Sequence, residues 1–202
     1  SAWVNQTTDP RMLADVDGDG SADIVGLSSY GPNVSLGNAA GTFDATFLGG
    51  EVLTQVYNAG GSDGFYLDYG SSLGDFNGDG KTDILWDWQN ADGTSKGDRI
   101  LWMSNGDGTF SITNNLAYQN TSYLGYASSL GDFNGDGKTD ILWDHKDANG
   151  TSTGYRYIWQ SNGDGTFTIQ ANTAGQNLSY IGYGSSLGDF NGDGKTDILW
   201  DH

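Results

Sequence analysis

The chain has 202 residues, enough for one domain with a hydrophobic core, and carries 26 acidic against 8 basic residues, a net charge of −18. This charge argues against a nucleic-acid partner, because phosphate-binding surfaces need clusters of lysine and arginine. The chain contains no cysteine, which excludes disulfide bonds and thiol chemistry. No apolar run approaches the roughly 20 residues of a membrane-spanning helix.

The first predicted element is a loop at residues 15–23, and its pattern, D-x-[DN]-G-D-G-x-x-D, recurs at residues 75–83, 132–140 and 189–197. Oxygen-bearing side chains at positions 1, 3 and 5, with glycine at position 6, are features of a loop that wraps around Ca²⁺. We expect position 7 to contribute its backbone carbonyl and the aspartate at position 9 to close the site with both carboxylate oxygens. A single loop of this kind is often a polar turn without metal, but four copies favour about four bound calcium ions.

These loops contain 13 of the 26 acidic residues. Without metal their carboxylates repel one another, so we expect the ions to be structural and to stabilise the folded chain. The predicted calcium ligands are Asp15, Asp17, Asp19, Ser21 and Asp23 in the first loop, Asp75, Asn77, Asp79, Lys81 and Asp83 in the second, Asp132, Asn134, Asp136, Lys138 and Asp140 in the third, and Asp189, Asn191, Asp193, Lys195 and Asp197 in the fourth.

Each loop is followed by a short β-branched and aromatic run, Asp-Ile-Val or Asp-Ile-Leu-Trp, which predicts a strand. A helix-loop-helix calcium motif needs a glutamate at position 12 and is therefore excluded, because glycine or tryptophan stands there.

The loops begin at residues 15, 75, 132 and 189, so the chain repeats about every 57 residues. In the third repeat we predict strands at residues 141–143, 155–160, 166–170 and 179–187, with an Asn-Gly-Asp-Gly hairpin turn at 162–165. The first repeat carries an insertion near residues 49–65. Helical periodicity is missing and 33 residues are glycine. The prediction is one all-β domain over residues 1–202, a propeller of four-stranded blades.

The chain resembles the FG-GAP/VCBS repeat family, the blades of integrin-α-like β-propellers. The matching features are the four Asp-rich loops, the Asn-Gly-Asp-Gly-Thr-Phe turns and the Asp-Ile-Leu-Trp strands. The resemblance implies structural calcium in a hairpin of each blade. It also implies relatives among fungal and bacterial lectins, extracellular adhesins, and propellers attached to toxins or polysaccharide-degrading enzymes.

Propellers of this family usually have seven blades, whereas the chain holds three full repeats with a strand before the first loop and a strand after the last. We therefore expect a partial ring, completed by further blades of a longer chain or by a second copy. The longer chain is favoured, because two copies would leave strands missing at the seam.

The candidates for catalysis are weak. His145 and His202 occupy one repeat position, which Trp88 fills in the second repeat, and three aspartates also align across the repeats, namely Asp87, Asp144 and Asp201. A repeated position favours a structural role, so we predict that the protein is not an enzyme. Unique polar residues occur only in the insertion, at Glu51, Tyr57 and Asp63.

Aromatic residues give the main indication of a binding function. Trp86, Trp143 and Trp200 follow the loops and are predicted to form the core between blades. Two further tryptophans, Trp102 and Trp159, each follow an arginine by three residues, Arg99 and Arg156. These repeated Trp/Arg pairs fit either a sugar site, with stacking on the indole and charged hydrogen bonds, or packing of one sheet on another around a structural ion pair. Trp88 and the loops at 89–98 and 146–154 are predicted surface. The candidate ligand residues are Trp88, Arg99, Trp102, Arg156 and Trp159.

Together these features predict a secreted, calcium-stabilised extracellular binding module with a glycan as its ligand. The alternatives are a protein-interaction or adhesion scaffold with an extracellular protein partner, and the accessory propeller of a polysaccharide-degrading enzyme or toxin.

Overall fold

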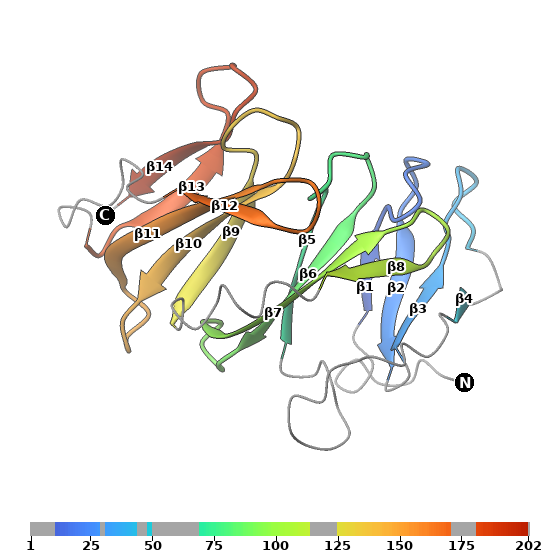
Figure 1. Ribbon diagram of the computed structural model, residues 1–202, viewed down its shortest axis with the longest axis horizontal. Helices are drawn as coiled ribbons and strands as arrows, with labels where there is room; N and C mark the ends of the chain where they lie inside the picture. Colours follow the sequence, from blue (N-terminus) through green and yellow to red (C-terminus); the bar gives the residue numbers. More distant parts are fainter. Residues whose placement is uncertain are drawn as a thin grey trace.

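The computed structural model describes residues 11–28, 31–43, 48–49, 69–113, 125–170 and 181–201. Within these residues the protein contains antiparallel strands and no helix, arranged as three four-stranded sheets and one two-stranded sheet (Figure 1). Each sheet is a blade, and consecutive blades lie side by side. This confirms the predicted all-β repeat architecture. The insertion residues Glu51, Tyr57 and Asp63 lie outside the described part of the chain.

The blades follow one another in chain order. The first contains β1 (Arg11–Ala14), β2 (Asp23–Ser28), β3 (Gly31–Ser35) and β4 (Leu48–Gly49), and the second contains β5 (Tyr69–Gly74), β6 (Asp83–Gln89), β7 (Ser95–Ser104) and β8 (Phe110–Thr113). The third contains β9 (Tyr126–Gly131), β10 (Asp140–Lys146), β11 (Ser152–Ser161) and β12 (Phe167–Gln170), and the half-blade contains β13 (Gly184–Gly188) and β14 (Asp197–Asp201).

Each Asp-rich loop joins the first and second strands of one blade. In the third blade Gly131 pairs with Asp140 and Leu130 pairs with Ile141, so the loop between them closes an antiparallel hairpin. The prediction that the strand at 179–187 is the fourth strand of the third blade is therefore wrong. The strand found there, β13, pairs with β14, which follows the fourth loop, and so belongs to the half-blade. The blade starts one strand earlier than the sequence repeat suggests.

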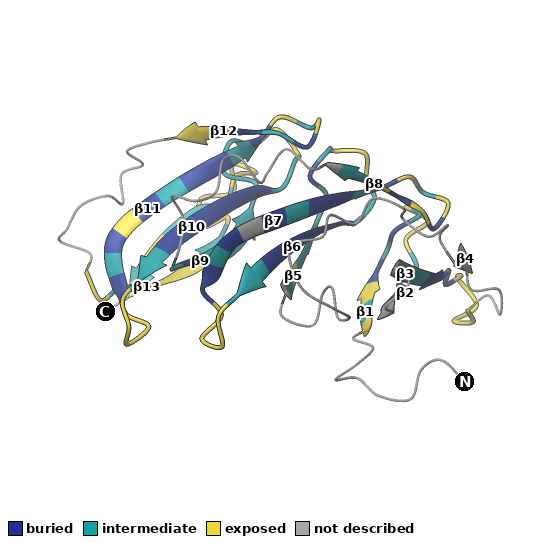
Figure 2. Ribbon diagram, turned by 60° about the horizontal axis from the view of Figure 1, so that its bottom comes forward, coloured by how far each residue is buried: buried dark blue, intermediate teal, exposed yellow. Residues whose placement is uncertain are grey.

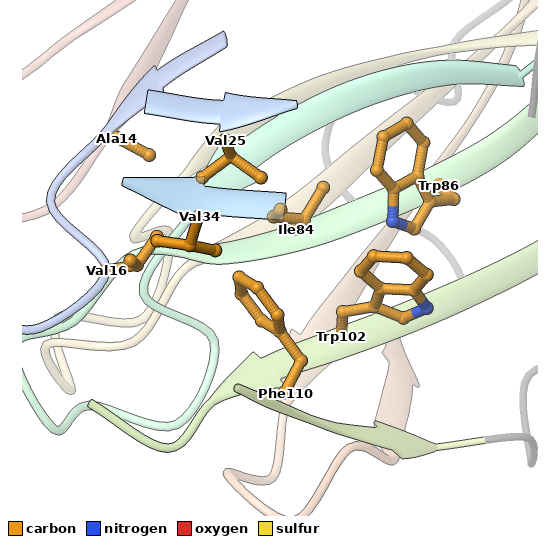
Figure 3. Packing of buried hydrophobic residues seen from close by; sticks show 8 residues of the cluster. All are labelled: Ala14, Val16, Val25, Val34, Ile84, Trp86, Trp102 and Phe110. Carbon is orange, nitrogen blue, oxygen red and sulfur yellow. The ribbon is translucent and has the colours of Figure 1, made fainter. Parts of the chain in front are cut away.

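The first hydrophobic core lies between the first two blades. Side chains of β1–β3 and the first loop, among them Val25 and Val34, meet Ile84, Trp86 and Trp102 of the second blade (Figure 3). Ile84 and Trp86 lie two residues apart in β6 and therefore point to the same face of the sheet. Both faces of β6 are covered, since Leu85 between them packs into the next core.

The second core lies between the second and third blades and repeats the first. It contains Phe76, Leu85 and Leu101 from one side and Ile141, Trp143 and Trp159 from the other. Trp86 and Trp143 are 1% and 0% exposed, which confirms their predicted place between blades. Figure 2 shows how buried residues run along β6, β7, β10 and β11. Within the described residues, no helix is long and apolar enough to span a bilayer.

Candidate metal loops and the opposite rim

The first carboxylate of each loop organises the loop backbone. In the first loop Asp15 accepts hydrogen bonds from the Gly18 and Gly20 amides, at 2.8 and 2.9 Å to its Oδ1 and Oδ2. The two glycines have φ angles of 79° and 85°, a left-handed conformation that other residues rarely adopt. The same bonds recur around Asp75, Asp132 and Asp189. Glycine at positions 4 and 6 is thus required by the sharp turn.

The aspartate at position 9 ties the loop to the sheet. Asp83 is fully buried, and its two carboxylate oxygens accept hydrogen bonds from the amides of Phe76 and Ser104, at 2.9 and 2.8 Å. Asp23 and Asp140 are held in the same way. A carboxylate has about four lone-pair sites, so these bonds leave acceptor capacity for a cation. Closure of the site by both oxygens stays a prediction.

The first loop brings its carboxylates together most closely. One carboxylate oxygen from each of Asp15, Asp17 and Asp19 can lie within 4.8 Å of the others. Burial raises the pKa of Asp17 above its usual 3.8, and the neighbouring carboxylates of Asp23, Asp19 and Asp15 raise it further. Ca²⁺ prefers hard oxygen ligands, and three such oxygens converge here. Their negative charges repel one another when no cation lies between them. The residues therefore fit the predicted ion, which would offset most of this negative charge.

The second, third and fourth loops differ from the first because their position 7 is lysine. Lys138 Nζ lies 2.7 Å from Asp136 Oδ2, and Lys81 pairs with Asp79 in the same way. The hydrogen bond from Lys138 holds the pKa of Asp136 below its usual value. These lysines supply part of the positive charge that the first loop lacks, where Ser21 stands at position 7.

Four of the five candidate ligand residues are buried within the blades. Arg99 and Arg156 are 1% and 0% exposed, and both Trp102 and Trp159 are 0% exposed. A sugar ring has no access to their faces. The structure supports the alternative interpretation of the Trp/Arg pairs, which is packing of one sheet on another around an ion pair.

The ion pair is a repeated unit. Asp87 Oδ1 lies 3.2 Å from Arg99 Nε, and the Ser95 hydroxyl bridges the two side chains. The Arg99 guanidinium carbon lies 3.9 Å from the centroid of the Trp143 ring in the next blade. The equivalent unit of Asp144, Ser152 and Arg156 places its guanidinium 3.9 Å from Trp200. Asp87 and Asp144 are thereby structural residues.

The fifth candidate, Trp88, lies at the rim opposite the Asp loops. In Figure 1 the Asp loops form the upper edge of the blades, and the β6–β7 and β10–β11 hairpins form the lower edge. Trp88 is half-buried near the end of β6, and Lys96 Nζ lies 4.6 Å from the centroid of its ring.

The third blade carries a second aromatic group at this rim. The His145 ring lies 4.8 Å from Tyr126 and 6.5 Å from Tyr155, measured between centroids, and its Nδ1 is 2.8 Å from Thr153 Oγ1. Tyr155 is 53% exposed. The sequence prediction did not include Tyr155. The sequence does contain an indication of it, because Tyr155 stands at the repeat position that Asp98 fills in the second blade. A position that varies between otherwise similar repeats indicates a specialised surface.

A backbone hydrogen bond joins these two parts of the rim. The Gly125 amide donates to the Ser95 carbonyl at 2.9 Å, and the next residues along the chain are Tyr126 and Lys96. The junction between the second and third blades therefore presents the rings of Tyr126, His145 and Tyr155 beside the Thr153 hydroxyl. Trp88 and Lys96 lie at the equivalent position on the other face of the second blade, because Trp88 shares the face of β6 that carries Ile84 and Trp86. Such a mixture can stack on an apolar ring face and hydrogen-bond to hydroxyls.

Comparison with known proteins gives two matches. The family model for the FG-GAP-like repeat matches the chain at residues 15–86, 75–143 and 146–200. Among solved structures, the chain is similar to a lectin from Agrocybe aegerita that recognises non-reducing terminal N-acetylglucosamine specifically, with a TM-score of 0.65 and 25% sequence identity. The match covers 96% of this chain and 47% of that lectin, so the chain spans about half the length of the lectin.

Proposed function

The chain belongs to the FG-GAP-like repeat family, and on that basis we propose that it is a calcium-stabilised, carbohydrate-binding module that acts outside the cell. The observation that carries the proposal is the likeness over 96% of the chain to a lectin that recognises terminal N-acetylglucosamine. The first ligand class to test is therefore a glycan that ends in this sugar.

The proposed sugar-binding surface is this rim, at two equivalent positions. Tyr155 offers a ring face beside His145 and Thr153 at the junction of the second and third blades, and Trp88 offers one beside Lys96 on the face of the second blade that is turned toward the first. Aromatic stacking and a few placed polar groups are the usual means by which proteins hold small polar ligands. The buried Trp/Arg pairs act indirectly, because they fix the sheets that carry this rim.

Calcium is proposed as a structural ion in each loop. It would be held by the carboxylates at positions 1, 5 and 9, by the carbonyl at position 7, and by the side chain at position 3, which is aspartate in the first loop and asparagine in the other three. When bound, it supplies positive charge that offsets carboxylate repulsion within each loop. Extracellular calcium is abundant enough to fill such loops, which agrees with the proposed location.

A non-enzymatic role is supported by the engagement of the repeated polar residues. Asp87 and Asp144 are held in buried ion pairs, and His145 lies against Thr153 and two tyrosines. Each therefore has a structural partner, and the aspartates are out of reach of a substrate.

The test is a glycan-array screen in calcium, followed by titration of the best glycan. We expect binding to glycans with terminal N-acetylglucosamine and an affinity about fivefold weaker for Tyr155→Ala or Trp88→Ala, since stacking on an aromatic ring contributes roughly 1 kcal/mol. Ile169→Ala is the matched control, because Ile169 is an exposed side chain on β12 away from this rim. A blank array from folded, calcium-loaded protein would contradict the proposal and favour a protein-binding scaffold.

A further inference from the structure

The Asp loops of consecutive blades are bonded to one another. The amide at position 8 of each later loop donates to the carbonyl at position 1 of the loop before it. The three bonds are Thr82 to Asp15 at 2.7 Å, Thr139 to Asp75 at 2.7 Å and Thr196 to Asp132 at 2.6 Å. The Asp132 amide also donates to Thr196 Oγ1 at 2.9 Å. The four loops therefore form one connected series along the edge of the blades.

Two further kinds of contact strengthen these junctions, a serine hydrogen bond at the first and second junctions and a lysine contact at all three. The Ser161 hydroxyl donates to the Phe76 carbonyl, at position 2 of the preceding blade's loop, at 2.6 Å, and Ser104 bonds Val16 in the same way. The lysine stem at position 7 lies against glycine at position 4 of the preceding loop, so that a Cβ on Gly135 would be 3.0 Å from Lys195 Cγ. We call the contacts that positions 7 and 8 make at one junction, together with the serine at the first two junctions, the inter-loop lock.

At each junction the later loop contributes positions 7 and 8 and the earlier loop contributes position 1, and the sequence differs accordingly between the first loop and the later ones. Every loop that reaches back to a preceding loop has Lys-Thr at positions 7 and 8, whereas the first loop has Ser21-Ala22. Gly37 replaces the serine in the first blade, as its amide bonds to Asp23 where the Ser104 amide bonds to Asp83. The lock residues are thus present in each described loop that contacts a preceding loop, which indicates that they serve the junction in addition to the ion pair within their own loop.

We propose that cation binding at neighbouring loops is energetically coupled through the inter-loop lock. The inference rests on the proposed calcium binding and adds that the sites do not act independently. The residue at position 1 has two roles, because its carboxylate organises its own loop and its carbonyl is held by the next loop. Fixing position 7 by a cation also fixes the adjacent position 8 amide, and thereby position 1 of the preceding loop. Such coupling acts equally in both directions.

The chain offers a matched pair of variants. Gly131 precedes the third loop, and a Cβ there would lie 2.7 Å from Thr196 Cγ2, so Gly131→Val pushes the third and fourth loops apart. Ala14 occupies this position at the first junction, which is why the larger valine is chosen. Gly188 is the equivalent residue before the fourth loop, and the three atoms nearest to a Cβ there all belong to the ring of Phe190, the closest at 3.3 Å. Gly188→Val is therefore the control.

A milder variant protects the test against misfolding. Thr196→Val preserves the shape of the side chain and removes the hydroxyl that accepts the bond from Asp132. It leaves every predicted metal ligand in place.

The measurement is calcium titration of the metal-free full chain by calorimetry. We expect wild-type protein and Gly188→Val to show positive cooperativity. Gly131→Val and Thr196→Val should show a shallower curve, with the affinity of the coupled sites lowered about fivefold or more. In the Gly131→Val background, Asp193→Ala should remove the fourth site without weakening the third, whereas in wild type it should weaken both.

Two results would overturn the inference, and they are distinguishable. Independent sites in the wild-type protein, with Gly131→Val equal to Gly188→Val, would remove the coupling and leave calcium binding intact. An absence of calcium binding by the wild-type protein would overturn the coupling together with the proposed metal.

Discussion

Arg99 shows how one residue joins two blades. Its guanidinium is paired with Asp87 in its own sheet and stacked on Trp143 of the next. Burial raises the pKa of Asp87, and the charge of Arg99 opposes this change. A buried carboxylate is costly without its partner, so the two side chains depend on each other.

Arg99→Met should lower the free energy of unfolding by roughly 3–5 kcal/mol, because it leaves the Asp87 carboxylate buried and unpaired. The double variant Asp87→Leu/Arg99→Met should recover part of this loss, since it removes both charges. Urea denaturation of the three proteins in calcium measures the effect. If the double variant is less stable than Arg99→Met, the loss in Arg99→Met does not come from the unpaired Asp87 carboxylate, and the argument from the ion pair is wrong.

Asp83 gives the metal-free protein a specific pH dependence. Burial raises its pKa from 3.8 to about 6, so between these values the folded state binds a proton that the unfolded chain releases. The stability contributed by this group is therefore present below about pH 4 and is lost as the pH rises through about 6.

We expect the stability of chelator-treated wild type, relative to Asp83→Asn, to fall between pH 4 and pH 6. Asparagine does not titrate, so the difference between the two proteins isolates this carboxyl group. Denaturant unfolding at intervals of half a pH unit measures it. In calcium the slope should reverse, because the cation binds the ionised carboxylate. A difference that is flat with pH in chelator would contradict the raised pKa.

At this scale the sequence predicted some residue environments and left others open. Trp86 and Trp143 were predictable as core, because each ends an apolar run that follows a loop. The Trp/Arg pairs could not be assigned from sequence, because a sugar site and a buried ion pair use the same residue types. Only the placement of Arg99 beneath Trp143, from a separate blade 44 residues later, distinguishes them.

The Asp-rich loop is the element that defines the blade. Its glycines, its first carboxylate and its last carboxylate each fix a part of the hairpin, and the next loop then holds it from outside. The loop and the strand after it were predictable, because oxygen spacing and glycine positions are local features. The start of the blade was not, because pairing of β13 with β14 is a contact between strands that no local pattern records.

Asp136→Ala should destabilise the protein in calcium by roughly 1–3 kcal/mol, since it removes the ligand at position 5 of the third loop. In chelator the effect should be smaller, because Asp136 then bonds only exposed or half-exposed groups of its own loop. Asp164→Ala is the control, as Asp164 lies in an exposed hairpin turn and bonds Thr166. Thermal unfolding with and without calcium measures both. Equal effects in the two conditions would show that Asp136 is a turn residue and not a ligand.

At the scale of the whole molecule, the described blades follow one another in a series, and the half-blade has an exposed apolar face. Phe190 and Leu199 of the half-blade are 60% and 54% exposed, whereas their equivalents in the second blade, Phe76 and Leu85, are 0% and 1% exposed. The internal equivalents are covered by the next blade. The repeat spacing predicted this succession of blades, and the closure of a ring stays a prediction.

If four coupled calcium loops hold this series of blades together, removal of calcium must destabilise the folded chain. Thermal unfolding of the wild-type chain is followed in calcium, after chelation, and after calcium is restored. We expect the melting temperature to fall by about 10 °C or more on chelation and to return with calcium, since each kcal/mol of lost stability moves it by several degrees. An unchanged melting temperature would mean that the loops are metal-free turns and that calcium does not hold the blades together.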